Sequence, residues 1–273
     1  MSYKTILFTA LVCVLGWCCV SCESNDPNVG SGTFASKPFT VDAKKKVVFS
    51  PGNLQYQPST NLWRFADQQY DYIGELNVEV SPNYDGWIDL FPYGSGDNPT
   101  YVCDENDYYD YYYDANFVDW GKNMKSDPSN RWYTLSKDEW LYLLEERDNA
   151  KELWGIGTVN HVKGVILLPD NWLIPKDLSF YPGADEKYGW NLNVYLANDW
   201  QKMEKNGAVF LPASGVCETD FGLDYDAGWG AYWTSTALDG TCAYYMELNT
   251  TRFVLDRFGT RYYRYAVRLV KDF

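Results

Sequence analysis

The sequence predicts an α+β fold built from short antiparallel strands and two helices. Short runs of alternating apolar and polar residues are separated by turn residues, which is typical of antiparallel strands. Two stretches carry apolar residues at helical spacing behind a capping pattern. Because these strands and helices do not alternate as βα units, the pattern disfavours a doubly wound, nucleotide-binding sheet.

The first part of the chain predicts a strand pair followed by a long insert. We expect strands at residues 46–56 and 61–66, joined by a turn at residues 57–60. Residues 94–130 contain an acidic, tyrosine-rich stretch without apolar periodicity. We therefore expect an insert loop there.

A helix and a buried strand are expected next. Ser136 and Glu139 have the spacing of a capping box, and leucines and a tryptophan follow at helical spacing, which predicts a helix over residues 137–149. Residues 164–169 include the run V-I-L-L, which is apolar at every position. Such a run predicts a strand that is buried on both faces.

A second helix is expected over residues 196–205. Asn198 and Gln201 are a weaker capping pair, and the Asn-Gly pair at 206–207 is a stop signal. Residues 208–212 then predict another buried strand.

The last part of the chain predicts an antiparallel meander. Its three runs are residues 242–248, 251–257 and 261–270, separated by turn residues. In the last run Arg264 and Arg268 alternate with apolar residues, so we expect them on the opposite face. One face of the meander should be core and the other should be open for contact.

Composition and charge restrict the partners. The 273-residue chain is 46% hydrophobic and contains 24 Tyr, 13 Phe and 12 Trp, enough for a full core and for aromatic binding surface. Its formal net charge is −14 and its pI is near 4.5. A polyanion would be repelled by such a surface, so we expect no nucleic-acid partner.

The N-terminus has the pattern of an export signal. Residues 6–20 are apolar but short for a membrane span, and they lead to a small Ser21 before Cys22. This resembles a lipoprotein cleavage box, which predicts a signal peptide over residues 1–22, lipidation of Cys22 and an outer-membrane, cell-surface location. Residues 23–45 are expected to be a flexible tether to a domain at 46–273.

Cysteines and clustered acidic residues are further candidates for a disulfide or a metal site. With Cys22 lipidated, Cys103, Cys217 and Cys242 remain, and Cys217 with Cys242 is the pair that proximity in the proposed sheet would favour as a disulfide. The spacing supports no zinc site. An acidic cluster offers oxygen ligands for calcium but lacks the EF-hand pattern, so a solvated loop is the preferred interpretation and calcium the alternative. The cluster consists of Asp104, Glu105, Asp107 and Asp110.

Several motifs in combination resemble a known family. The C-terminal ones are G-x-G-x-Y-W-T-S-T, A-Y-Y and Y-x-x-A-V-R-L-V, at Gly228, Gly230, 232–236, 243–245 and 266–270. Upstream ones lie at residues 49–57, 63–75, 132–144, 164–172 and 202–215. The chain resembles bacterial C-type-lectin-like surface lipoproteins that are targets of diversity-generating retroelements. It is more distantly similar to the formylglycine-generating enzyme fold and the Fibrobacter-type major paralogous domain.

The resemblance implies two helices packed on a small twisted sheet with long loops, and a C-terminal meander that presents diversified side chains. Diversification at adenines of Asn-type codons cannot yield Trp, Met or Glu, so Trp233, Met246 and Glu247 should be scaffold. Tyr232 and Tyr245 are expected in the core. The candidate ligand-binding residues are Asp239, Thr241, Cys242, Tyr244, Thr251, Arg252, Val254, Asp256, Arg257, Arg261 and Tyr263.

The function expected from these features is non-catalytic recognition of an extracellular protein or glycan, with adhesion as its biological setting. A structural subunit of a fimbrial tip or cell envelope is the alternative from another class. An enzyme of the formylglycine-generating type is disfavoured, because no cysteine lies beside the closing Tyr265-Ala266-Val267-Arg268 segment. His161 lies in a turn-like segment without a partner signal, which favours a surface or structural role.

Overall fold

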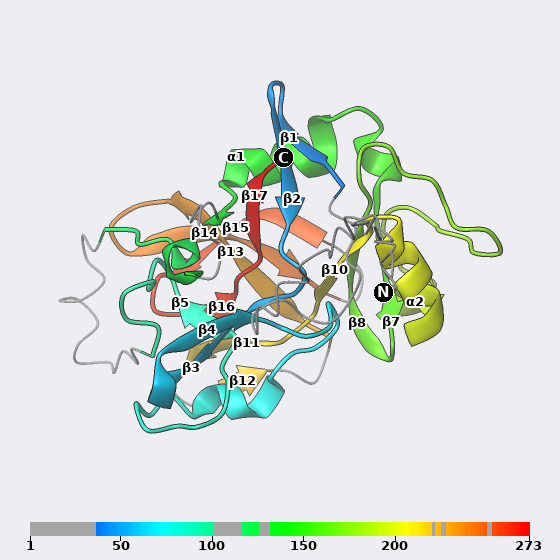
Figure 1. The fold of residues 1–273 in the computed structure, drawn as a ribbon. Coiled ribbons are helices and arrows are strands. Elements are labelled where there is room, and N and C mark those ends of the chain that lie inside the picture. The colour runs from blue at the N-terminus through cyan, green and yellow to red at the C-terminus, as the bar shows by residue number, and fades with distance from the viewer. Residues whose placement is uncertain (1–36, 101–115, 126–131, 220–221, 225–227, 250–252) are drawn as a thin grey trace, which may run out of the picture.

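The computed structural model describes residues 37–100, 116–125, 132–219, 222–224, 228–249 and 253–273 (Figure 1). The described chain combines several small sheets with two short helices, so the α+β class is confirmed. The helices are α1 (Lys137–Leu141), which continues as a π turn at Tyr142–Glu146, and α2 (Ala197–Lys205). Short 3₁₀ turns lie at Pro58–Thr60, Gly74–Val78, Trp120–Asn123, Ala150–Glu152 and Gly189–Asn191.

The first sheet joins the beginning and the end of the described chain. Its order is β1 (Phe39–Asp42), β2 (Lys45–Phe49), β17 (Leu269–Asp272) and β6 (Tyr133–Thr134). Val270 on β17 lies opposite Phe49 on β2, and the strands are antiparallel (Figure 1). Phe39 in β1 is fully buried. Because β1 falls within residues 23–45, the expected tether ends earlier than the sequence suggested.

The strand expected over residues 46–56 divides into β2 and β3 (Leu54–Gln57). β3 pairs antiparallel with β4 (Leu62–Phe65) across the turn at Pro58–Thr60, as predicted. Between β2 and β3, Ser50 Oγ donates a hydrogen bond to the carbonyl of Gly52 at 2.9 Å. The chain therefore bends out of the first sheet, and the hairpin forms a sheet of its own.

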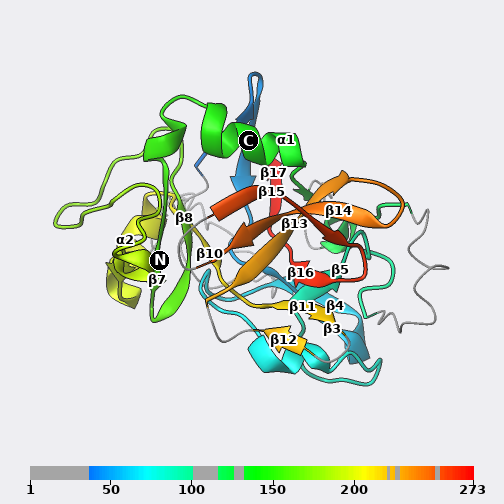
Figure 2. The ribbon, with the colours of Figure 1, turned by 180° about the vertical axis from the view of Figure 1, so that it is seen from behind.

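The largest sheet contains most of the C-terminal strands (Figure 2). Its order is β12 (Gly222–Asp224), β11 (Val216–Thr219), β16 (Arg264–Ala266), β13 (Gly230–Ala237), β14 (Cys242–Leu248) and β15 (Phe253–Thr260), with β5 (Leu90–Pro92) also pairing with β16. β14 has the predicted bounds. The third expected run of the meander is wrong, because β16 pairs in parallel with β13 and the chain then enters the first sheet as β17.

Two hydrophobic clusters cover opposite faces of the β13–β14 pair. Tyr232 and Met246 belong to one cluster with α1 and the first sheet, whereas Trp233 and Tyr245 belong to the other, with β3, β4 and β5. A strand alternates its side chains between faces, so a sheet covered on both sides buries consecutive residues. The expected core position of Tyr232 and Tyr245 is confirmed, at 0% and 7% exposure.

A fourth sheet carries α2 on its outer side (Figure 1). Its order is β10 (Val209–Pro212), β8 (Val162–Leu167), β7 (Trp154–Val159) and β9 (Val194–Tyr195). In β8, Val165 packs into the cluster with the first sheet and Ile166 into a separate cluster with Trp200 and Met203 of α2. The V-I-L-L run is therefore buried on both faces, as predicted.

The helix termini agree with the sequence in part. Ser136 and Glu139 form the expected capping box at α1. At α2 the expected capping pair is wrong, because the N-cap residue is Leu196, without a side-chain hydrogen bond. The stop at Gly207 is confirmed, since this residue has φ +93 just after the helix.

Candidate binding surface on the C-terminal strands

Strands β14 and β15 form a ribbon whose two sides present different side chains. Tyr244 lies opposite Phe258 and Tyr245 lies opposite Arg257 in the antiparallel register. Because successive residues point to opposite faces, Tyr244 and Phe258 share one side and Tyr245 and Arg257 share the other. We call the first the helix side, since α1 packs there, and the second the tyrosine side.

The helix side ends in an exposed aromatic pair. The Tyr244 and Phe258 rings meet edge to face with centroids 6.4 Å apart, and Phe258 is 58% exposed. Lys137 Nζ, from the first turn of α1, lies 4.1 Å from the centroid of the Tyr244 ring. This cation–π contact fixes the tyrosine ring while leaving Phe258 open to solvent.

The tyrosine side is an aromatic stack that runs outward from the core. Tyr265 lies 4.5 Å from Trp233 and 4.6 Å from Tyr245 between ring centroids. Tyr263 follows at 6.1 Å from Tyr265, and Tyr262 at 5.0 Å from Tyr263. The half-buried Tyr262 and Tyr263 therefore stand on a rigid, buried support.

Two hydroxyl groups in this stack, those of Tyr245 and Tyr265, are held in the protonated form. Burial raises the pKa of Tyr245 to about 12, with Glu218 adding to the effect. Burial also raises the pKa of Tyr265, together with Tyr245 and Glu218, and its hydroxyl donates to Glu218 Oε1 at 2.6 Å. At neutral pH these tyrosines are thus neutral hydrogen-bonding groups rather than phenolates.

Beside the stack lies an ion pair. Arg257 Nε is 3.1 Å from Glu247 Oε2, and the arginine side chain is 42% exposed. Asn249 Nδ2 donates to the other carboxylate oxygen of Glu247 at 2.9 Å. The buried glutamate positions Arg257, whose exposed part remains available to a ligand.

The turn between β13 and β14 is built by Asp239. Its Oδ1 accepts hydrogen bonds from the backbone N–H groups of Thr241 and Cys242, both at 2.7 Å, and these bonds hold the pKa of Asp239 below its usual value. Arg261 donates from Nη2 to the Asp239 carbonyl. The carboxylate thus orders the turn by mimicking a backbone acceptor.

The predicted candidates fall into four groups. Asp239 and Asp256 are exposed, and Thr241, Cys242, Tyr244, Val254, Arg257 and Tyr263 are half-buried. Arg261 is a correction, because it is only 7% exposed and lies over the Tyr93 ring, 5.3 Å from its centroid. Thr251 and Arg252 lie outside the described residues. The candidates also divide between the two sides of the ribbon and its ends rather than forming one surface.

The scaffold prediction agrees with burial. Trp233, Met246 and Glu247 are 1%, 0% and 8% exposed. Phe258 was missed, because the expected middle run stopped one residue before it. Alternation alone would not have placed it, because a register shift puts Phe258 opposite Tyr244, on the other side of the ribbon from Val254.

Two arginines expected on the open face are buried instead. Arg264 is 9% exposed and donates to the Asn77 carbonyl at 2.8 Å and to Cys217 Sγ at 2.9 Å. Arg268 is 1% exposed. These arginines and the apolar residues between them point to opposite faces, but both faces are covered by other parts of the fold. Alternation therefore did not mark a solvent-facing side.

The cysteine and metal expectations have different outcomes. Cys217 and Cys242 are free thiols, so the disulfide favoured by proximity does not form. Their strands, β11 and β14, are separated in the sheet by β16 and β13. Among the described residues no His, Cys, Asp and Glu side chains gather as a metal site. The acidic cluster at residues 104–110, Cys103 and Cys22 lie outside the described part of the chain.

Comparisons with protein families, with curated proteins and with solved structures found no match. In the described parts of the chain, no helix has the length and apolar character needed to cross a membrane. His161 is exposed in the tight β7–β8 turn, where it and Asn160 both have positive φ.

Proposed function

We propose that the protein is a cell-surface binding protein that recognises an extracellular protein or glycan, without catalysis, through the ends of β14 and β15 and the adjoining residues 262–263. The division of these strands into buried and accessible positions carries the proposal. Trp233 and Met246 are sealed in the core, while Tyr244, Arg257 and Tyr263 retain exposed surface beside them.

The chemistry of the accessible positions supports recognition. Tyrosine and arginine provide large contact areas and hydrogen bonds at low entropic cost when they are already held in place. Tyr263 is held by the stack on Tyr265, and Arg257 by its ion pair with Glu247. A ligand would therefore meet a preorganised surface.

We propose a C-type-lectin-like fold and a diversified C-terminus on the sequence motifs, with support from the structure. Two short helices packed against small, mostly antiparallel sheets agree with that fold. Positions that codon diversification cannot reach, at Trp233, Met246 and Glu247, are buried. A template copy of the C-terminal coding sequence that differs only at adenines, beside a reverse-transcriptase gene, would test the diversification.

The lipid anchor and outer-membrane location remain proposals from the Ser21-Cys22 signal. Wild-type protein is expected to enter the detergent phase in a phase-partition assay, and Cys22→Ser to remain in the aqueous phase. Unchanged partition of the Cys22→Ser protein would reject the anchor.

Binding is tested with an array of glycans and an array of extracellular proteins. Tyr263→Ala is expected to weaken binding to any wild-type hit by about tenfold. Tyr244→Ala tests whether the helix side of the ribbon also contacts the ligand, in which case it weakens binding as well. Tyr72→Ala is the matched control, because this exposed tyrosine lies outside the C-terminal strands. The proposal fails if hits respond equally to all three substitutions.

A further inference from the structure

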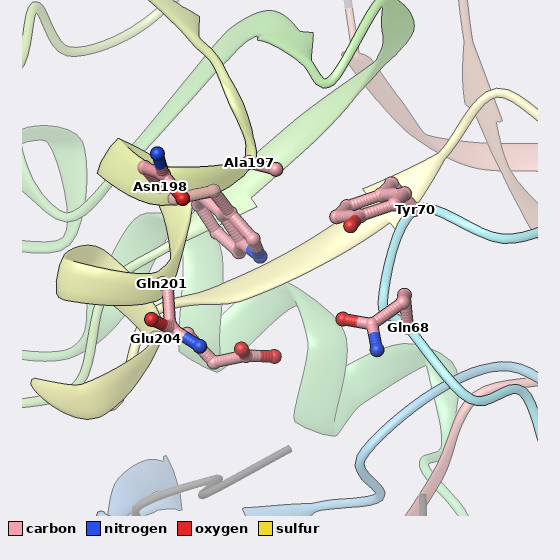
Figure 3. A pocket seen from close by; sticks show the side chains of 7 residues that line it. Gln68, Tyr70, Ala197, Asn198, Gln201 and Glu204 are labelled. Carbon is pink, nitrogen blue, oxygen red and sulfur yellow. The ribbon is translucent and has the colours of Figure 1, made fainter. Parts of the chain in front are cut away.

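A cavity of about 220 Å³ lies between α2 and the segment that follows β4, away from the C-terminal ribbon. Its walls include Gln68, Tyr70, Asn198, Trp200, Gln201 and Glu204. Figure 3 shows Gln201 and Glu204 on one side and Gln68 and Tyr70 on the other, with the Glu204 carboxylate directed toward Gln68. The cavity has the volume of about seven water molecules at roughly 30 Å³ each, so it suits a small ligand.

Behind the cavity, the buried side-chain amide of Gln69 makes hydrogen bonds that hold Glu204 in place. Gln69 Nε2 donates to Glu204 Oε1 at 2.8 Å and to the Ala208 carbonyl at 3.1 Å. Gln69 Oε1 accepts from the Phe210 N–H at 2.8 Å and from Arg268 Nη2 at 2.7 Å. All four hydrogen-bonding positions of this side chain are occupied. Glu204, only 7% exposed, is therefore fixed from behind in one orientation.

The walls contain hydrogen-bonding groups that the fold does not use. Trp200 is 1% exposed, and its Nε1 has no hydrogen-bond partner among the described residues. Its ring is held in place by Phe210, with centroids 5.7 Å apart. A buried donor without a partner costs free energy, so such groups call for an explanation.

The charge of the cavity selects against anions. Among the described residues that line the cavity, Glu204 is the one carboxylic acid, and none is a Lys, Arg or His. Burial raises the pKa of Glu204, whereas the Gln69 hydrogen bond and Arg268 oppose this shift. Arg268, behind Gln69, balances the negative charge, which reduces the attraction for a cation. Neutral groups that both donate and accept fit this lining best.

We propose that this cavity binds one neutral monosaccharide unit, with hydroxyl groups bonded to Glu204 and to the amides of Gln68 and Gln201, and the sugar ring placed against Tyr70. Asp71 and Glu204 add to burial in raising the pKa of Tyr70, which keeps its hydroxyl able to donate. Two aromatic side chains stand beside amide and carboxyl groups in this lining, a combination that matches the apolar ring faces and the hydroxyl groups of a sugar. This site is separate from the C-terminal ribbon and goes beyond the function proposed for it.

Saturation-transfer NMR on the full chain tests the site with D-glucose, D-mannose, D-galactose and their methyl glycosides as probes. At least one neutral sugar is expected to bind, with a dissociation constant on the order of millimolar. Binding of a methyl glycoside would identify the terminal unit of a glycan as the source, and binding of the free sugar alone would identify a free monosaccharide. Either result supports the proposal.

Variants locate the binding. Gln201→Ala, which removes an amide, and Ala197→Phe, which fills the cavity from an exposed position, are each expected to weaken sugar binding at least about fivefold. Lys205→Ala is the control on the same helix, and Tyr263→Ala is the control on the C-terminal ribbon. Both should change binding by less than about twofold. Thermal unfolding of each variant verifies that the fold is retained.

The proposal is overturned if no neutral sugar binds, or if Ala197→Phe binds the sugar as well as the wild type does. Loss of sugar binding in Tyr263→Ala but not in Gln201→Ala would place the sugar on the C-terminal ribbon. That result would reject the cavity while leaving the proposed function intact.

Discussion

Arg268 donates from Nη2 to Oε1 of Gln69 at 2.7 Å, across 199 positions of sequence. The arginine lies between β16 and β17 and is 1% exposed, and its Nη1 donates to Asn53 Oδ1 at 3.3 Å. Burial lowers the pKa of Arg268 to about 10, with Tyr232 and Glu204 opposing the shift. The guanidinium is thus charged at neutral pH and joins the C-terminal strands to the segment beneath α2.

Replacing Arg268 is therefore expected to destabilise the fold. Arg268→Met keeps much of the side-chain volume but leaves Glu204 without its nearest balancing charge. We expect the free energy of unfolding to fall by about 3 kcal/mol, measured by urea denaturation. Adding Glu204→Gln should recover part of the loss, because it removes the uncompensated charge. Lys202→Met is the exposed control, because its ion-pair partner Asp199 is exposed as well, and its expected change is below about 1 kcal/mol. Equal losses for Arg268→Met and Lys202→Met would contradict this account.

Asp89 should make stability depend on pH. The residue is fully buried, its carboxylate accepts from Ile73 N–H at 3.0 Å and Asn77 Nδ2 at 2.7 Å, and burial raises its pKa to about 6. The folded chain therefore binds this proton more tightly than the unfolded chain, in which the pKa is near 3.8. The stabilisation from this difference is full below pH ~4 and is lost as pH rises through about 6.

The size of this effect follows from the shift of about two pKa units, which corresponds to about 3 kcal/mol. Urea denaturation of the wild type and Asp89→Asn across pH ~4 to ~7 measures it. The stability of the wild type relative to the variant is expected to decline by about that amount over the range. Parallel pH profiles would show that Asp89 titrates normally.

Ser136→Ala tests the capping box of α1. Ser136 Oγ accepts from the Glu139 N–H at 3.2 Å, and Glu139 Oε2 accepts from the Ser136 N–H at 2.7 Å. Loss of the serine hydroxyl is expected to cost about 1 kcal/mol in urea denaturation. Glu139→Gln is the informative partner, since it keeps an acceptor for Ser136 and loses the ion pair with Lys45 at 2.6 Å. Its expected cost is below about 1 kcal/mol. If Glu139→Gln cost more than Ser136→Ala, the ion pair with Lys45 would contribute more at this helix start than the serine cap does.

Local signals made several elements predictable. The capping box at Ser136, the glycine stop at Gly207 and the continuous apolar run in β8 each act over a few residues, so the sequence contains the whole cause. The bounds of β14 were predicted for the same reason, because turn residues lie on both sides. The helix expected over residues 196–205 forms as α2 over Ala197–Lys205, although the expected side-chain cap at its start does not form.

Residues whose partners are distant in sequence could not be placed from the sequence. Arg264 and Arg268 alternate with apolar residues as solvent-facing residues would, yet their partners Asn77, Cys217 and Gln69 are distant in sequence. The composition of the proposed binding surface could not be predicted either. A register shift between Tyr245 and Glu247 displaces β15 relative to β14, so alternation alone could not assign its residues to one side.

Gly259→Ala should disturb the tyrosine side of the ribbon specifically. A Cβ at this position would lie 3.0 Å from Tyr263 Cδ2, 3.2 Å from Tyr245 Cε1 and 3.2 Å from the Tyr265 hydroxyl oxygen. Tyr263 must then move, because Tyr245 and Tyr265 are buried. We expect a loss of about 1 to 2 kcal/mol in the free energy of unfolding and a change in near-ultraviolet circular dichroism.

The double variant Gly259→Ala/Tyr263→Ala separates crowding from backbone effects. If Tyr263 packing on Gly259 is the cause, removing the ring makes room for the methyl group, and the alanine at 259 should cost at least about 0.5 kcal/mol less in that background. Thr260→Ala, the adjacent position on β15, is the control and should leave the circular dichroism unchanged. An equal cost of Gly259→Ala with and without the Tyr263 ring would mean that the glycine serves the strand backbone rather than the aromatic surface, and the preorganisation of Tyr263 would lose its support.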